Sequence, residues 1–323
     1  MHRVFLTALA VTLSLSANGA LAAAGEFPSK PVRIISPYPP GGGNDIISRT
    51  IAENLTQEWG QNVIVENRAG AGGNVGTDIA AKSPPDGYTM VMGSLSHAIN
   101  ASLYSKLPFD PVGDFAPITL IASGSYVLVA HPSLPAKDVK SLVALAKSRP
   151  GQINYGSAGN GSGGHLGMEL FKLMSGTDIV HVPYKGTAPA MMETVGGQVS
   201  LDMDNMLALL PQIKADRLRA LAVTSLKRSP LLPQVATMDE SGYRGFEVSP
   251  WFGTLAPAGT PREIVARISR DTAKILKLPK VRERLLSQGA EPVGNTPDEF
   301  LQYLKGEVAK WAKVVKATGA RVD

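Results

Sequence analysis

Residues 156–166, Gly-Ser-Ala-Gly-Asn-Gly-Ser-Gly-Gly-His-Leu, join an expected strand to an expected helix in the middle of the chain. Residues 38–45, Tyr-Pro-Pro-Gly-Gly-Gly-Asn-Asp, make the same kind of junction near its beginning. Glycines at the start of a helix leave the first backbone N–H groups accessible, and these donors together with the helix dipole suit an anion. The alternative for the first junction is a tight turn capped by Asn44 or Asp45.

Strand-like and helix-like stretches alternate on both sides of these junctions. Strands are predicted over 32–36, 63–66, 88–93, 118–130 with a crossing inside, 153–157, 179–184, 199–203, 218–224 and 251–256. Helices are predicted from about 45 to 59, over 74–82, 142–148, 165–174, 187–195 and 206–214, and at the end over 261–276, 281–288 and 297–316. This order favours an α/β fold with parallel sheets.

Two apolar crossings, near 121–126 and 225–252, divide the alternating stretches into two lobes. Lobe one is predicted over 25–122 and 228–323, and lobe two over 123–227. A cleft between two such βα lobes is a natural ligand site.

The N-terminus has the pattern of an export signal. The basic residues His2 and Arg3 precede an apolar stretch over 4–15, which is too short to span a bilayer. Small residues ending at Ala22 or Ala24 fit a cleavage site. We therefore predict that residues 1–24 are a signal peptide and that the mature protein is periplasmic or secreted; a retained membrane anchor is the alternative.

Composition excludes several classes of protein. The 323 residues hold 32 basic and 27 acidic side chains, a net charge of +5, with only 6% aromatic residues and no long basic run. A dedicated nucleic-acid-binding protein is therefore not expected. The absence of cysteine excludes disulfides, thiolate metal sites and a cysteine nucleophile. No histidine spacing typical of a metal site occurs, so no metal is predicted.

Three further candidates lie at other expected strand ends. Ser94 follows the third strand, Thr187 stands where a helix begins, and Asp204 ends a strand just before another helix. Each could contact a ligand in the cleft. Thr187 and Asp204 are also ordinary helix-capping residues, which is the alternative for both.

The same residues allow two enzymatic interpretations. Gly159, Gly161 and Gly164 satisfy the G-x-G-x-x-G spacing, but the nearest acidic residue, Asp178, precedes the next strand instead of ending it. A dinucleotide site is therefore excluded and no cofactor is predicted. A Ser157, His165 and Asp204 triad of a secreted hydrolase lacks the G-x-S-x-G elbow.

These motifs together resemble one family, the Bug-type extracytoplasmic solute receptors, which are the substrate-binding components of tripartite tricarboxylate transporters. The resemblance extends over essentially the whole mature chain. It is carried by residues 38–45, 66–74 (Glu-Asn-Arg-Ala-Gly-Ala-Gly-Gly-Asn), 156–166, 182–190 (Val-Pro-Tyr-Lys-Gly-Thr-Ala-Pro-Ala), 196–199, 204–205, 221–225 and 256–261. Two departures affect the expected pocket: Asn44 replaces a common Thr or Ser, and Gly164 replaces a bulkier residue.

The resemblance implies a type II periplasmic binding protein fold with a hinged cleft between two lobes. It implies capture, without catalysis, of a di- or tricarboxylate, an acidic amino acid or an aromatic acid, and delivery to membrane permease subunits by a monomeric receptor. A ligand-sensing subunit of a signalling system would share the same cleft. Together, the motifs and the resemblance assign ligand binding to Tyr38, Gly42, Gly43, Asn44, Ser94, Ser157, Ala158, Gly159, Ser162, His165, Thr187 and Asp204.

Overall fold

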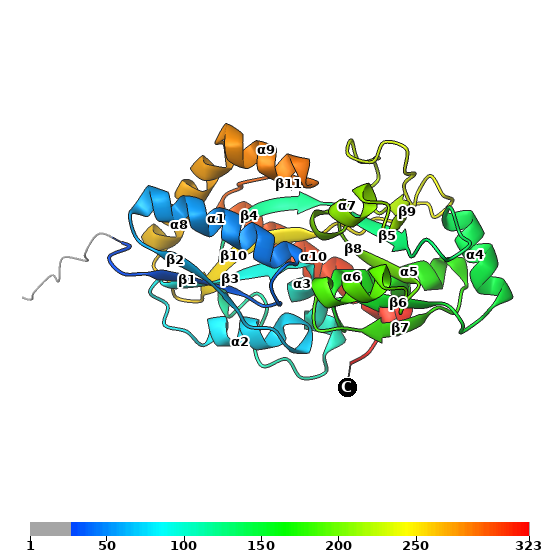
Figure 1. The fold of residues 1–323 in the computed structure, drawn as a ribbon. Helices are drawn as coiled ribbons and strands as arrows, with labels where there is room; N and C mark the ends of the chain where they lie inside the picture. Colours follow the sequence, from blue (N-terminus) through cyan, green and yellow to red (C-terminus); the bar gives the residue numbers. More distant parts are fainter. Residues whose placement is uncertain (1–26, 323) are drawn as a thin grey trace, which may run out of the picture.

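The computed structural model describes residues 27–322 and contains two β-sheets flanked by helices. Figure 1 shows the two sheets side by side, each with its own helices. The predicted signal peptide, residues 1–24, lies outside the described residues.

The first sheet has six strands in the order β11-β4-β10-β3-β1-β2. Its strands are β1 (Val32–Ser36), β2 (Val63–Asn67), β3 (Thr89–Ser94), β4 (Phe115–Gly124), β10 (Trp251–Pro257) and β11 (Ala290–Pro292). The helices around it are α1 (Gly43–Trp59), α2 (Asn74–Ala81), α3 (Leu95–Leu103), α8 (Arg262–Leu276), α9 (Pro279–Ser287) and α10 (Pro297–Thr318), with a short 3-10 helix, η1 (Ala71–Gly73).

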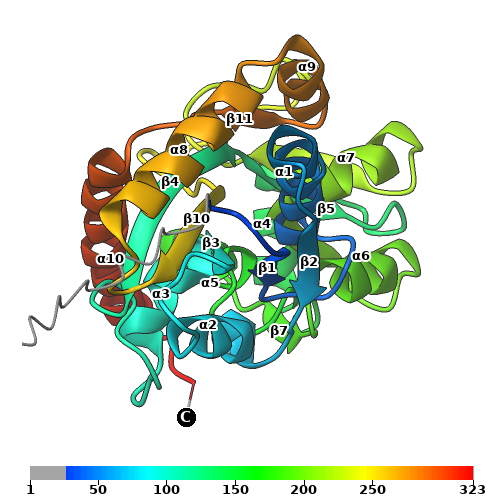
Figure 2. The same cartoon turned by 90° about the vertical axis from the view of Figure 1, so that its left-hand side faces the viewer.

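The second sheet has five strands in the order β7-β6-β8-β5-β9. Its strands are β5 (Tyr126–Ala130), β6 (Asn154–Ser157), β7 (Val180–Pro183), β8 (Leu201–Asn205) and β9 (Arg219–Val223). Its helices are α4 (Val139–Ser148), α5 (Gly163–Ser175), α6 (Thr187–Val195) and α7 (Met206–Lys214). The view in Figure 2 shows α1 and α8 near each other on one side of the first sheet, with α2 and α3 on the other.

The expectation of parallel sheets is wrong for part of each lobe. Strands β1, β2 and β3 are parallel, but β10 is antiparallel to both β3 and β4, and β11 is antiparallel to β4. In the second sheet β5 is antiparallel to β8 and β9. Parallel neighbours are joined by a crossover helix within one sheet. The chain reaches β10 from the other lobe, and it reaches β5 directly from β4. Neither strand follows a crossover helix within its own sheet, so neither has to run parallel to its neighbours.

Besides the three-residue η1, two elements lie outside the predicted ranges. No helix is predicted between 82 and 142, whereas α3 begins at once after β3. The three-residue β11 pairs with β4 between α9 and α10. The strand β11 is short and its backbone partners on β4 lie far away in the sequence. Helix α3 is buried on nearly all sides, so its apolar residues show no clear helical period.

The chain passes between the sheets at two places. It leaves the first sheet after Gly124, enters the second at Tyr126, and returns between Val223 and Trp251. The predicted lobe limits, 122/123 and 227/228, lie close to these passages and stay predictions of where a hinge would be.

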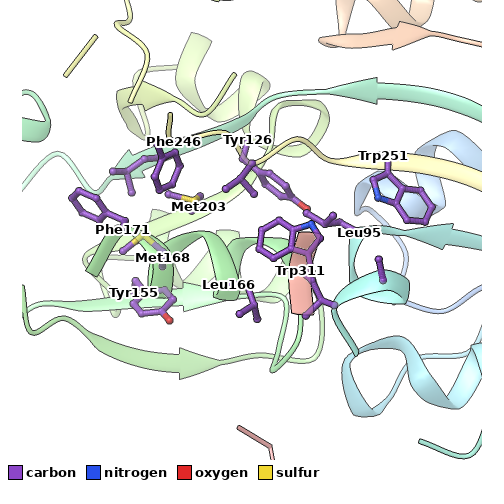
Figure 3. Close-up of a cluster of buried hydrophobic side chains, with 14 of the residues drawn as sticks. Leu95, Tyr126, Tyr155, Leu166, Met168, Phe171, Met203, Phe246, Trp251 and Trp311 are labelled. Carbon is purple, nitrogen blue, oxygen red and sulfur yellow. The ribbon is translucent and has the colours of Figure 1, made fainter. Parts of the chain in front are cut away.

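One hydrophobic cluster continues from lobe one into lobe two. It includes Leu95 of α3 and Trp311 of α10 together with Leu166 of α5 and Met203 of β8. Figure 3 shows Trp311 drawn among side chains of both lobes, with Tyr126 close by. A second cluster lies under α1, α8 and α9 on the other face of the first sheet. The C-terminal helix therefore packs on its own sheet and also contacts α5 of lobe two.

None of the helices over residues 27–322 combines the length and the apolar character that crossing a membrane requires. That range also contains no group of three or more His, Asp or Glu side chains arranged to hold a metal ion.

Candidate functional site

A cavity of about 30 Å³ lies between the lobes. Such a volume is enough for a few atoms, on the scale of one or two waters or one carboxylate group. Residues from both sheets and from the connection into β10 line it. They are Tyr38, Gly42, Gly43, Asn44, Ser94, Ser96, Tyr126, Ala158, Ser162, Gly163, Gly164, Thr187, Asp204, Asn205, Pro250, Trp251 and Phe252.

Five helices begin at this cavity. Gly42 and Gly43 start α1, Ser94 precedes α3, Ser162 precedes α5, Thr187 starts α6, and Asn205 precedes α7. The N-caps of α1, α3 and α6 make no side-chain capping bond, so the first backbone N–H groups of those helices keep unpaired donors. The positive ends of five helix dipoles thus meet at one small space, which is favourable for a negative charge.

Hydroxyl and amide groups of lobe one form one wall of the cavity. The Tyr38 hydroxyl lies 2.8 Å from Ser96 Oγ and 2.9 Å from the Gly72 carbonyl oxygen, and Ser96 Oγ lies 3.0 Å from Ser94 Oγ. Asn44 donates its amide to the Met92 carbonyl at 2.9 Å. These bonds fix the side chains before any ligand arrives, so the wall is preorganised.

The opposite wall comes from lobe two. Asp204 Oδ1 accepts hydrogen bonds from the backbone N–H and from Nδ2 of Asn205, both at 2.6 Å. Asn205 in turn caps α7, because its Oδ1 accepts from the backbone N–H of Ala208 at 3.2 Å. Ser162 caps α5 by accepting from the backbone N–H of His165 at 3.3 Å. The residue that caps α7 is therefore Asn205 and not Asp204. The N-cap of α6 is Gly186 and not Thr187.

Glycines let the two walls approach each other closely. A Cβ atom on Gly42 would lie 3.4 Å from Thr187 Cβ across the cleft. A Cβ on Gly43 would lie 2.6 Å from Phe252 Cζ and 3.0 Å from Asn205 Oδ1. Within lobe two, a Cβ on Gly164 would lie only 1.9 Å from the Met203 carbonyl oxygen, so α5 can reach β8 only with glycine at this position.

Most of the residues predicted for ligand binding are brought together here. The structure places nine of the twelve in the cavity lining: Tyr38, Gly42, Gly43, Asn44, Ser94, Ala158, Ser162, Thr187 and Asp204. The other three, Ser157, Gly159 and His165, do not line this cavity.

Ser157 and His165 belong instead to a buried network inside lobe two. Ser157 Oγ lies 2.7 Å from Nε2 of His181, and the His181 ring stacks on that of His165 at 4.2 Å between centroids. His165 Nδ1 accepts from the backbone N–H of Gly161 at 3.2 Å. Burial lowers the pKa of His165 to about 4 and that of His181 to about 3. Both imidazoles are therefore neutral at physiological pH and hold the Gly-rich turn in shape.

Sequence reasoning missed eight lining residues, which are Ser96, Tyr126, Gly163, Gly164, Asn205, Pro250, Trp251 and Phe252. Gly163, Gly164 and Asn205 lie within the quoted motifs, and the position of each at a helix start was a usable signal. Ser96 lies on α3, whose start the sequence pattern does not mark. Tyr126, Trp251 and Phe252 lie where the chain passes between lobes. Their apolar runs predict buried strand, and nothing local shows that they meet at the cleft.

The electrostatics of the cavity are unusual for an anion site. None of the described residues that line it is a lysine, arginine or histidine. Burial raises the pKa of both Tyr38 and Tyr126 well above the usual range, so both phenols stay protonated as hydrogen-bond donors. Burial also raises the pKa of Asp204 to about 6. Backbone amides and neutral hydroxyls thus supply the positive potential of the site.

A second, larger cavity of about 360 Å³ shares Tyr38 and Ala158 with the first. Most of its remaining wall comes from η1 with the preceding Gly70, from Tyr104, and from the loop after β7 that carries Tyr184 and Lys185. Gly159, one of the three residues absent from the small cavity, lines this one. Tyr38 and Ala158 thus lie at the boundary between the two cavities.

Comparison with known proteins identifies related chains over nearly the full length. The family model of the tripartite tricarboxylate transporter family receptor matches residues 47–320. The protein BugT of Bordetella pertussis is 39% identical over 319 residues, which cover 98% of this chain and 98% of BugT.

Two solved structures with named ligands are similar as well. Rpa4515 of R. palustris with adipate has 39% identity and a TM-score of 0.89, covering 91% of this chain and 99% of that one. MatC from Rhodopseudomonas palustris with bound malate has 32% identity and a TM-score of 0.86, covering 90% and 100%. These similarities confirm the predicted two-lobe α/β fold and the resemblance to the Bug-type receptors.

Proposed function

The chain belongs to the receptor family of the tripartite tricarboxylate transporters, and on this basis we propose that it captures a small organic carboxylate in the periplasm and delivers it to membrane permease subunits. In this proposal residues 1–24 are removed on export, the mature receptor is a monomer, and it releases its ligand chemically unchanged. The two lobes are 25–122 with 228–323 and 123–227, and they close around the ligand.

The convergence of five helix N-termini on one small cavity is the observation on which this proposal rests. A carboxylate that enters the cavity loses water, which costs several kcal/mol unless hydrogen bonds replace it. Each charge-assisted bond from a backbone amide or hydroxyl contributes about 1.5–3 kcal/mol. Several such bonds offset the desolvation without any arginine or lysine.

Two related receptors support a carboxylate as the ligand. The solved structure of Rpa4515 holds adipate and that of MatC holds malate. Adipate and malate are both dicarboxylates. The small cavity has room for one carboxylate group only. We therefore place the first carboxylate of the ligand there and the rest of the molecule in the larger cavity, past Tyr38 and Ala158, where Lys185 offers a cation for a second carboxylate.

A hydrolase would need a nucleophile next to a base and open to a substrate. Within residues 27–322 two such pairs lie at 2.7 Å: Ser157 with Nε2 of His181, and Ser133 with Nδ1 of His131. The pair Ser133 and His131 is exposed in a local turn and lines neither cavity. Ser157 is fully buried and lines neither cavity, and the lowered pKa of His181 makes its imidazole a poor proton acceptor. These features favour a receptor over a secreted hydrolase.

A thermal-shift screen of residues 25–323 tests the proposal. The panel consists of adipate, malate, succinate, citrate, glutamate and nicotinate. A ligand present at about 100 times its Kd adds about 2.7 kcal/mol to the free energy of unfolding, which gives a clear rise in Tm. We expect such a rise in Tm with at least one acid. We also expect that this acid, when it is recovered after incubation with the protein, is chemically unchanged.

Hexanoate serves as the matched control for adipate, because it has the same carbon chain and only one carboxylate. A larger shift with adipate than with hexanoate would support a second anionic subsite near Lys185. If no acid in the panel changes Tm and calorimetry detects no binding, the carboxylate-receptor proposal is wrong.

A further inference from the structure

The site contains one ionisable group whose charge opposes the proposed ligand. Among the described residues that line the small cavity, Asp204 is the only carboxylic acid, and no basic side chain accompanies it. The Asp204 side chain is 4% exposed. Because the cavity measures only about 30 Å³, a ligand carboxylate placed in it would lie beside Asp204.

The partners of Asp204 leave it capable of holding a proton. Both donors of Asn205 bond to the same oxygen, Oδ1, at 2.6 Å. The Thr187 hydroxyl is a further hydrogen-bond partner of the carboxyl group. A hydroxyl can donate or accept, so it can satisfy either the carboxylate or the carboxylic acid.

A second buried carboxyl group lies two residues away. Asp202 and Asp204 point to the same face of β8, because side chains alternate along a strand. Asp202 is fully buried, and among the described residues the only hydrogen-bond donor near enough to its carboxyl group to interact with it is the backbone N–H of Met203. Burial and the neighbouring Asp204 raise the pKa of Asp202 well above its usual range, so this group is neutral. Asp204 is the member of the pair that ionises near neutral pH.

Other titratable or charged groups lie on the elements packed against β8. They are Tyr126 on β5, Tyr155 on β6, His165, Glu169 and Lys172 on α5, Glu193 on α6 and Lys214 on α7, with Tyr38 facing from the β1–α1 loop. Of these only the two neutral phenols, Tyr38 and Tyr126, line the cavity. No cation in this set reaches the cavity to neutralise Asp204.

We propose that Asp204 sets the charge selectivity of the receptor. It contacts the ligand carboxylate in its own neutral, protonated form, so that each captured carboxylate enters the cavity together with one proton. The proton is held between the Asp204 carboxyl group and the ligand carboxylate, as a hydrogen bond from the one to the other. This inference rests on the proposed function and adds to it the chemistry at one wall of the site.

The physical reason is that two carboxylates in contact in a buried site cannot both be ionised. In the free protein Asp204 has a pKa of about 6, so it is ionised at neutral pH. An anionic ligand beside it stabilises the protonated form and raises this pKa further. Binding therefore takes up a proton, and affinity falls as pH rises above 6, by up to about tenfold per pH unit. Below pH 6 Asp204 is already protonated and the pH dependence levels off.

Calorimetry in two buffers of different ionisation enthalpy counts the protons. Adipate, malate, glutamate and nicotinate are titrated into the wild-type protein at about pH 7.5, where their carboxyl groups are ionised. We expect uptake of about one proton per bound ligand. Uptake of no proton, or release of one, by an acid that does bind would overturn the role of Asp204 and leave the carboxylate-receptor proposal standing. Failure of all four acids to bind would overturn both.

Two matched variants locate the proton. Asp204→Asn keeps the size of the side chain but cannot titrate, so we expect no proton uptake and an affinity that no longer changes with pH. Asp202→Asn imitates the neutral form of Asp202 and does not alter the cavity lining, so it should keep the uptake of the wild type. Uptake retained in Asp204→Asn, or lost in Asp202→Asn, would place the proton elsewhere and contradict the proposal. If Asp204→Asn does not fold, the wild-type proton count and its pH profile still decide.

Discussion

Gly43 shows how much of this site depends on the absence of a side chain. It is the first residue of α1, and the three atoms that a Cβ would meet, Phe252 Cζ at 2.6 Å, Phe252 Cε1 at 2.9 Å and Asn205 Oδ1 at 3.0 Å, belong to residues that line the cavity. Phe252 is fixed in the core beneath α1, so it has little room to withdraw.

Replacing Gly43 by alanine should therefore damage binding more than folding. Overpacking by one methyl group costs about 1–3 kcal/mol, part of which appears as lost affinity when Asn205 and Phe252 shift. We expect Kd for the best acid of the screen to rise about tenfold or more, which is about 1.4 kcal/mol. Calorimetric titration of Gly43→Ala measures this. Gly306→Ala, a glycine with no atom within 4 Å of its Cβ position, is the matched control and should bind normally.

Among the elements, the C-terminal helix α10 packs against both lobes, as its contacts with β4 and α3 of lobe one and with α5 of lobe two show. It begins with a capping box, in which Thr296 and Glu299 exchange hydrogen bonds, and it ends at Gly319 in the left-handed conformation. Phe300, Leu304 and Trp311 are buried in the cluster that continues into lobe two. Its stability therefore contributes to the whole molecule and not to lobe one alone.

Gly306 is an exposed position in the middle of this helix. Glycine in a helix interior costs about 0.5–1 kcal/mol relative to alanine, because it loses more backbone freedom on folding. Gly306→Ala should raise the free energy of unfolding by that amount, as measured by urea denaturation with an unchanged m-value. A loss of stability would show that the helix is distorted or packed differently at this residue.

At the scale of the whole molecule, the two lobes meet around the cavity. Gly42 of lobe one and Thr187 of lobe two would have Cβ atoms 3.4 Å apart, close to the separation found in disulfides. The natural chain contains no cysteine, so an introduced pair has no competing thiol. A cross-link at this point would join the start of α1 in lobe one to the start of α6 in lobe two.

The double variant Gly42→Cys with Thr187→Cys should form a disulfide on oxidation and hold the lobes together. We expect the oxidised protein to exchange ligand at least tenfold more slowly than the same protein after reduction. The reduced double variant and the two single variants are the controls for the substitutions themselves. If the pair does not oxidise under conditions that link accessible thiols, the lobes do not meet in solution as the structure shows.

The helix starts at the site were largely predictable, and the lobe contacts were not. Gly42, Ser162 and Thr187 were identified because each stands where a strand gives way to a helix, which is a local pattern. Ser157 and His165 have the same pattern, yet they bond within lobe two and do not line the cavity. The side of a turn on which a hydroxyl or imidazole lies depends on neighbours such as His181, which is 24 residues away.

The amino-acid sequence by itself determined the order of helices and strands, the Gly-rich junctions and the family, because these depend on periodicity and on residues adjacent in the chain. Tertiary structure decided the antiparallel entry of β10, the contribution of Tyr126, Trp251 and Phe252 to the cavity, and the burial of Asp202 beside Asp204. The physical reason is distance along the chain: the pairing of strands that lie far apart in the sequence, and the burial that shifts the pKa of a carboxyl group, arise from contacts between segments that no local pattern relates.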